Sequence, residues 1–158
     1  MLNKNEMAAC KKILKTDKDN GKFIIDKNAI VCTESGILLV FRRDTGINQQ
    51  IQLNNETILS LTSFDSFTLN ENYVEIRAGN AIHTTKRIPS SLNYQRVIPD
   101  SFSGEAANFN TKYLNIIYEL VKSENKTGYF KIQFNGRNPA RVDINNNCFA
   151  IIAPLNFD

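Results

Sequence analysis

The order of the predicted elements repeats along the chain: an amphipathic helix is followed by three antiparallel strands. This unit begins near residues 4, 54 and 110, and the sequences of the three copies are not alike. Because each element has one apolar face to bury, such units can place their strands in one sheet and all their helices on the opposite face. The pattern therefore predicts an α+β protein whose antiparallel sheet is covered by helices on one side.

The helices are predicted from apolar spacing and from capping residues. Met7, Cys10 and Leu14 recur at intervals of three and four, which is the spacing of a single helical face. We predict helices at residues 4–15, 56–63 and 112–123. The candidate caps are Asn54 or Asn55 for the second helix and Asn110 or Thr111 for the third. The apolar stripe of the third helix is predicted to comprise Leu114, Ile117, Tyr118 and Val121.

The strands are predicted from apolar runs separated by short turns rich in Asn and Gly. We place them at 22–26, 29–33, 36–43, 47–53, 65–69, 73–78, 81–88, 128–134, 140–144 and 148–153. Residues 89–107 contain Pro89, Pro99 and Gly104 and are predicted to form a loop, which is the best internal boundary of the chain.

Composition limits the class of protein. A chain of 158 residues with 42% hydrophobic residues and a net charge of +3 suits a globular domain that needs no disulfides. The charge is mild, so it either keeps the protein soluble or supports weak, salt-sensitive contact with DNA. Because the three cysteines form no CxxC pair, and neither a signal peptide nor a membrane span is evident, we expect reduced thiols, a cytoplasmic location and no membrane contact.

No residue pattern in the chain suggests catalysis. His83 is the only histidine, and it falls in a predicted strand without a metal-binding or catalytic partner set. Glycine-rich phosphate loops and nucleophile motifs are absent from the sequence. We therefore expect no catalytic residue, no metal and no cofactor, and an enzyme is the least supported of the functions considered.

Several segments, taken in order, match one family. Residues 92–99 read Leu-Asn-Tyr-Gln-Arg-Val-Ile-Pro, residues 109–114 read Phe-Asn-Thr-Lys-Tyr-Leu, and residues 151–155 read Ile-Ile-Ala-Pro-Leu. They resemble, respectively, the interdomain link, the start of the last helix and the C-terminal Met-Pro-Met segment of the bacterial sliding clamp, the beta subunit of DNA polymerase III. Residues 31–39 resemble the strand, turn and strand that carry Asp-Gly-His-Arg-Leu in that family.

The resemblance implies a shortened clamp, corresponding to the middle domain and the end of the last domain. We expect residues 1–90 to form a clamp-like domain of two modules, residues 91–108 to form a link, and residues 109–158 to form a third, half-domain module. The first domain and the first half of the last one have no counterpart. An orphan half-domain leaves an open sheet edge that invites pairing with other copies, so we expect a homo-oligomer.

In the clamp family, partner peptides bind a small apolar pocket between the middle and last domains. The matching positions here are Thr33, Leu39, Leu92, Arg96, Val97, Ile151, Ala153, Pro154 and Leu155. Aliphatic residues replace several family residues, for example Ile37 and Leu38 for His and Arg. The alternative is that the strand residues are ordinary core and that Arg96 makes a surface ion pair.

Clamps also turn their helices towards double-stranded DNA and hold it without reading its sequence. The resemblance implies that basic residues on or just after the first helix, and on the third, do so here: Lys4, Lys11, Lys12, Lys15, Lys18, Lys112 and Lys122. The alternative is a solvated lysine face with no ligand.

Two functional hypotheses follow. The first is a clamp-like replication accessory, encoded by a phage or another mobile element, that tethers a DNA polymerase or other replication proteins through short apolar motifs and encircles DNA as an oligomer. The second is an interaction module, or an inhibitor that mimics a clamp, which keeps the pocket without encircling DNA.

Overall fold

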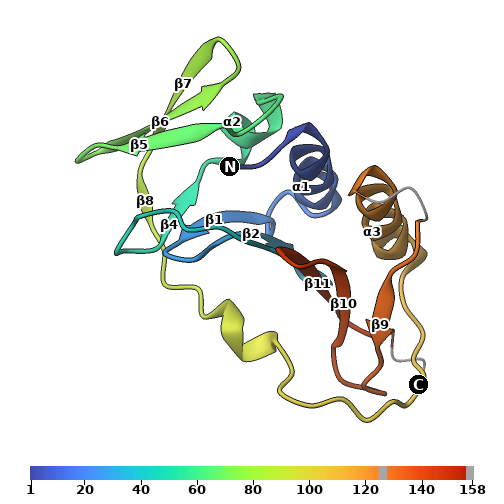
Figure 1. Cartoon of the computed structure of the whole chain (residues 1–158). Coiled ribbons are helices and arrows are strands. Elements are labelled where there is room, and N and C mark those ends of the chain that lie inside the picture. The colour runs from blue at the N-terminus through green and yellow to red at the C-terminus, as the bar shows by residue number, and fades with distance from the viewer. Residues whose placement is uncertain (125–127, 156–158) are drawn as a thin grey trace.

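The strands of this chain form two antiparallel sheets, with the helices on one side of them (Figure 1). The structure is a computed structural model that describes residues 1–124 and 128–155. Its helices are α1 (Lys4–Thr16), α2 (Asn55–Ser60), α3 (Thr111–Glu124) and a 3-10 turn, η1 (Tyr94–Val97). Its strands are β1 (Lys22–Asp26), β2 (Ala29–Glu34), β3 (Ile37–Arg42), β4 (Ile51–Leu53), β5 (Ser66–Leu69), β6 (Tyr73–Ala78), β7 (Ala81–Lys86), β8 (Ile88–Pro89), β9 (Lys131–Gln133), β10 (Ala140–Asn145) and β11 (Cys148–Ile152).

The larger sheet joins the first and third modules. Its eight strands run in the order β8-β4-β1-β2-β3-β11-β10-β9. At the seam between the modules, β3 pairs with β11 from Ile37 opposite Ile152 to Phe41 opposite Cys148. Strands far apart in sequence therefore lie side by side in the middle of the sheet.

The second module departs from the expected single sheet. Strands β5, β6 and β7 form their own three-stranded sheet. Strand β4 pairs with the edge of β1 that does not pair with β2, and the two-residue strand β8 pairs with the other edge of β4. The three modules therefore do not share one continuous sheet: of the strands between α2 and η1, only β8 joins the larger sheet, through β4.

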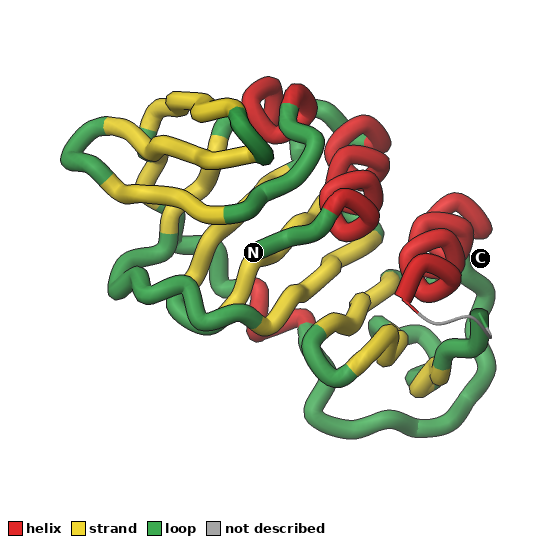
Figure 2. The backbone as a smooth tube through the Cα atoms, turned by 45° about the horizontal axis from the view of Figure 1, so that its top comes forward, coloured by secondary structure: helices red, strands yellow, loops and turns green. Residues whose placement is uncertain are grey.

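Helices α1, α2 and α3 lie together on one side of the strands, with α1 packed against both α2 and α3 (Figure 2). The predicted face of α1 is confirmed, since Met7, Cys10 and Leu14 are all buried. The stripe of α3 is only partly correct, because its buried residues are Ile116, Ile117, Leu120 and Val121, whereas Tyr118 is 42% exposed. None of the helices described is both long and apolar enough to cross a membrane.

Hydrogen bonds and one ion pair fix the N-terminus of α1. Asn3 accepts from the amides of Asn5 and Glu6, and the Glu6 carboxylate accepts in return from the amide of Asn3. The other carboxylate oxygen of Glu6 lies 2.7 Å from the Arg43 guanidinium. Glu6 is only 3% exposed, so this ion pair ties the start of α1 to the segment after β3 with little competition from water.

Candidate peptide pocket and helix face

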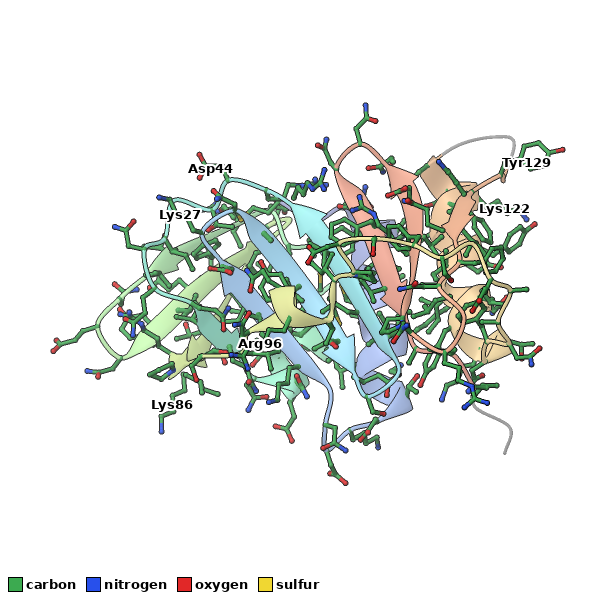
Figure 3. The ribbon with its side chains drawn as sticks, turned by 90° about the horizontal axis from the view of Figure 1, so that it is seen from below. Lys27, Asp44, Lys86, Arg96, Lys122 and Tyr129 are labelled. Atoms are coloured by element: carbon green, nitrogen blue, oxygen red, sulfur yellow. The ribbon has the colours of Figure 1, made fainter. Side chains whose placement is uncertain are left out.

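The sheet face opposite the helices is covered by the segment that links the second and third modules. Tyr94, Leu92 and Ile98 of this link pack on apolar residues of four strands. Those residues are Ile24, Ala29, Val31, Leu38, Val40, Phe149 and Ile151. Figure 1 shows the link crossing below the sheet, and Figure 3 looks onto this face with Arg96 labelled on η1. The large sheet therefore has a second apolar layer, which we call the outer face.

Polar contacts fix the link in place. The Gln50 side chain donates to the carbonyl of Leu92 at 3.1 Å and accepts from the Ser90 hydroxyl at 2.8 Å. Tyr94, the first residue of η1, is buried. Burial raises the pKa of Tyr94 to about 12, and the charge of Asp26 adds to the rise. The phenol therefore remains a neutral donor beside Asp26 throughout the physiological range.

A pocket of about 180 Å³ opens on the outer face at one end of the seam between β3 and β11. Four of the residues predicted to bind peptide meet there, from β2, η1, β11 and the segment just after β11: Thr33, Val97, Ile151 and Ala153. Its other lining residues are Glu34, Ser35, Gly36, Ile37, Leu38 and Pro139. The walls are mostly aliphatic, and Val97 is 47% exposed, so the pocket presents apolar surface that a ligand side chain can cover.

Leu39 does not line this pocket. Side chains of a strand alternate between faces, and Leu39 belongs to the core on the helix side, where it is 1% exposed. Its neighbour Leu38 points to the outer face and takes the expected place in the pocket wall. The residue of β3 that lines the pocket is therefore Leu38, and not Leu39 as predicted.

The remaining predicted pocket residues lie outside the lining. Leu92 packs on the outer face beside η1, and Arg96 is exposed on η1. Pro154 and Leu155 continue from the pocket wall, where Leu155 pairs with Asn108 and is 41% exposed. None of these four residues lines the pocket.

The turn at one edge of the pocket, residues 34–36, is held from both sides. The Glu34 carboxylate accepts from the Ser35 hydroxyl at 2.8 Å and from the Gly36 amide at 3.1 Å. The Gly36 carbonyl accepts from the amide of Ala153 at 3.0 Å. On the helix side, the ring of Tyr113 lies so close that a Cβ added at Gly36 would come within 2.5 Å of it. A larger residue at position 36 would therefore have to displace the Tyr113 ring.

Sequence reasoning missed Leu38, Pro139 and the supporting role of Tyr113. Strict alternation along residues 36–43 contained the signal for Leu38, because Leu38, Val40 and Arg42 share one face and Leu39 and Phe41 share the other. The contact between Tyr113 and residues 34–36 joins segments separated by more than 70 positions in the sequence, and no local pattern encodes it.

The opposite face of the molecule carries the predicted basic residues. Lys12 and Lys15 of α1 and Lys112 of α3 line a hollow of about 280 Å³ between the two helices, with Thr16, Asn115 and Ile116. A neighbouring hollow of about 110 Å³ includes Lys12 but also Glu119. Partial burial lowers the pKa of Lys11, and the charge of Lys15 adds to the effect. Three of the seven predicted lysines therefore meet at one place.

The other predicted lysines are more scattered. Lys4 is exposed in the first turn of α1, and Lys18 is exposed in the turn that follows it. Lys122 lies near the far end of α3, with its ammonium 5.9 Å from the centre of the Tyr118 ring. Within residues 1–124 and 128–155, no cluster of three or more histidine, cysteine or acidic side chains is arranged to hold a metal ion.

Comparison with solved structures identifies the architecture. The DNA polymerase III beta subunit of Borrelia burgdorferi superposes with a TM-score of 0.65 at 11% identity, over 100% of this chain and 64% of that one. The Thermotoga maritima beta subunit gives 0.63 at 11% identity, over 100% and 65%. The Helicobacter pylori beta clamp bound to a DNA ligase peptide gives 0.61 at 12% identity, over 98% and 64%.

This chain has the sliding-clamp fold. The resemblance suggested by the sequence is thereby confirmed at the level of the fold, with antiparallel sheets and the helices on one side. The chain spans 64–65% of the length of these clamp chains. No protein-family model matches the sequence, and no curated protein is similar enough to match.

Removing the Tyr113 hydroxyl tests the support of the pocket turn. Burial raises the pKa of this phenol to about 12, and interaction with the Glu34 carboxylate adds to the rise. We expect Tyr113→Phe to lower the free energy of unfolding by about 1–2 kcal/mol, since a buried carboxylate loses a donor. Urea denaturation at neutral pH measures the change.

The matched control is Tyr118→Phe on the same helix, which removes a hydroxyl from an exposed ring and should change stability by less than about 0.5 kcal/mol. The folded pKa of Tyr113 lies above the ordinary value of 10.0. The advantage of wild type over Tyr113→Phe should therefore be complete below pH 10 and fade as the pH rises towards about 12. Equal effects of the two substitutions would contradict the support role.

Proposed function

We propose that this chain is a sliding-clamp-like replication accessory that tethers replication proteins, such as a DNA polymerase, through its outer-face pocket. The observation that carries the proposal is the position of the pocket at the seam between β3 and β11, opposite the helices. A tether of this kind requires no catalytic residue. It needs one surface for the partner and another for DNA, and the fold separates these two surfaces by the full thickness of the sheet.

The comparisons support a peptide as the ligand class, since one of the similar structures is a clamp bound to a DNA ligase peptide. The chemistry of this pocket agrees with such a ligand. A Leu or Phe side chain buried against Val97, Leu38 and Ile151 contributes about 1.5–3 kcal/mol. A single side chain is not enough for micromolar affinity, which needs about 8 kcal/mol, so the partner segment must add main-chain or flanking contacts.

Val97→Asp tests the pocket. The substitution places a charge in the apolar wall, so we expect the affinity for capped peptides that carry adjacent Leu and Phe residues to fall about tenfold or more. Isothermal titration calorimetry measures the dissociation constant. Ile82→Asp is the matched control, because Ile82 is 60% exposed on the separate small sheet. Loss of affinity in both variants, or in neither, would reject this pocket as the binding site.

On the helix side, we propose that α1 and α3 hold double-stranded DNA by charge, without sequence preference. Changing Lys12, Lys15 and Lys112 together to Gln should weaken binding to a short duplex of mixed sequence. The slope of log affinity against log salt should fall by about 0.9 for each phosphate that the variant no longer neutralises. Fluorescence anisotropy at several salt concentrations measures both quantities.

The matched control for the DNA experiment changes Lys27, Lys86 and Lys131 to Gln. These exposed lysines lie on β-turns and strands outside the helix face, and Figure 3 labels the first two. An equal loss of affinity in the control variant would show that DNA responds only to net charge and would contradict a helix-face site.

A second candidate function is a protein-interaction module or clamp-mimicking inhibitor that does not encircle DNA. One observation favours it: every wall of the pocket comes from a single copy of the chain, so peptide binding requires no assembly. Sedimentation velocity separates the candidates. An encircling clamp should assemble into a closed oligomer as concentration rises, through edge strands such as β9 and β7. A monomer at every concentration, with peptide binding intact, would favour the second function.

A further inference from the structure

Beside the pocket, one aromatic ring on the outer face carries two guanidinium groups. Phe149 belongs to β11, two residues before the pocket residue Ile151. The Arg141 guanidinium lies 4.3 Å from the centre of its ring, and that of Arg42 lies 5.3 Å from the same centre. Phe149 is 5% exposed, so the two arginine side chains and the neighbouring strands cover it almost completely.

Arg141 lies beside a residue of the pocket wall. In the register of β10 and β11 it stands opposite Ile151, and side chains of opposed residues on one face are neighbours. Its Nε donates to Asp143 at 2.7 Å, while the second carboxylate oxygen of Asp143 accepts from Gln133 at 2.8 Å. Among the residues that the structure describes, the two terminal nitrogens of Arg141 have no hydrogen-bond partner. They form a planar pair of donors that suits a carboxylate.

Arg42 adds a second positive charge at the far side of the ring. Within the described parts of the chain, no carboxylate lies within 4.0 Å of its guanidinium. The Asp143 carboxylate therefore neutralises the charge of only one of the two guanidinium groups beside Phe149, that of Arg141. Guanidinium groups stacked on aromatic rings are weakly hydrated and held in place, so an incoming anion displaces little ordered water and meets donors that are already oriented.

We propose that the partner segment bound in the pocket carries an Asp or Glu residue close to its apolar side chains, and that Arg141 binds this carboxylate with support from Arg42. The proposal rests on the proposed peptide-binding function and names the chemistry of the partner. The apolar side chain fills the space between Leu38, Val97 and Ile151, and the carboxylate meets the terminal nitrogens of Arg141 one strand away. An acidic residue thereby selects among peptides of equal hydrophobicity.

The test uses the full chain and pairs of capped peptides with one Leu-Phe core. Each pair differs only in having Asp or Asn at one flanking position, and the position is moved along both sides of the core. At low salt, titration calorimetry should find a position at which Asp binds about tenfold more tightly than Asn. In Arg141→Gln this ratio should fall to about one, and in Arg42→Gln it should fall part of the way. Arg77→Gln, on the small sheet, should leave it unchanged.

The outcomes separate this proposal from the function on which it rests. Binding of both members of every pair with ratios near one, or a ratio that survives Arg141→Gln, would overturn the acidic preference and leave the pocket function standing. Failure of every peptide to bind wild type, including those that retain the Leu-Phe core, would overturn both. Because Arg42→Gln leaves the ion pair of Arg141 with Asp143 in place, a loss of selectivity in that variant cannot be ascribed to damage to β10.

Discussion

The pairing of β3 with β11 is the interaction on which the rest of this structure depends. It joins strands from opposite ends of the chain in the middle of the large sheet. All five residues of β11 are buried, and their side chains contribute alternately to the helix-side core and to the outer face. Without this seam the third module has no sheet to extend.

The candidate pocket is a consequence of the same seam. One wall comes from β2, β3 and the turn between them, a second from β11 and Ala153, and the link supplies Val97. The hydrogen bond from the Ala153 amide to the Gly36 carbonyl closes the end of the seam. The two guanidinium groups beside Phe149 come from the strands on either side of β11, since Arg42 belongs to β3 and Arg141 to β10.

Local signals were sufficient to predict most elements. The helix at 4–15 and the strands at 22–26 and 73–78 agree with the structure to within a residue, because caps, tight turns and apolar spacing act within a few positions. The strand expected at 47–53 is formed only at Ile51–Leu53. Ile47 is nevertheless buried. An apolar residue at an alternating position can therefore pack in the core without belonging to a hydrogen-bonded strand.

What the sequence did not predict depends on contacts between distant segments. Which strand pairs with β4 decides where the second module meets the large sheet, and that strand is the two-residue β8. Leu38 rather than Leu39 faces the pocket because α1 and α3 cover the other side of the sheet. The resemblance to clamps predicted the correct fold. It also named Thr33, Val97, Ile151 and Ala153, which meet in one pocket of the structure. The arginines beside Phe149 matched no motif and became visible only from the register of the strands.

Nuclear Overhauser effects between a bound peptide and methyl-labelled protein test the central claim most directly. If the seam between β3 and β11 builds a peptide pocket on the outer face, aromatic protons of a Leu-Phe peptide will show contacts to the methyl groups of Leu38, Val97 and Ile151. Contacts to Ile116 between the helices, or to Ile82 on the small sheet, in place of these three would contradict the account.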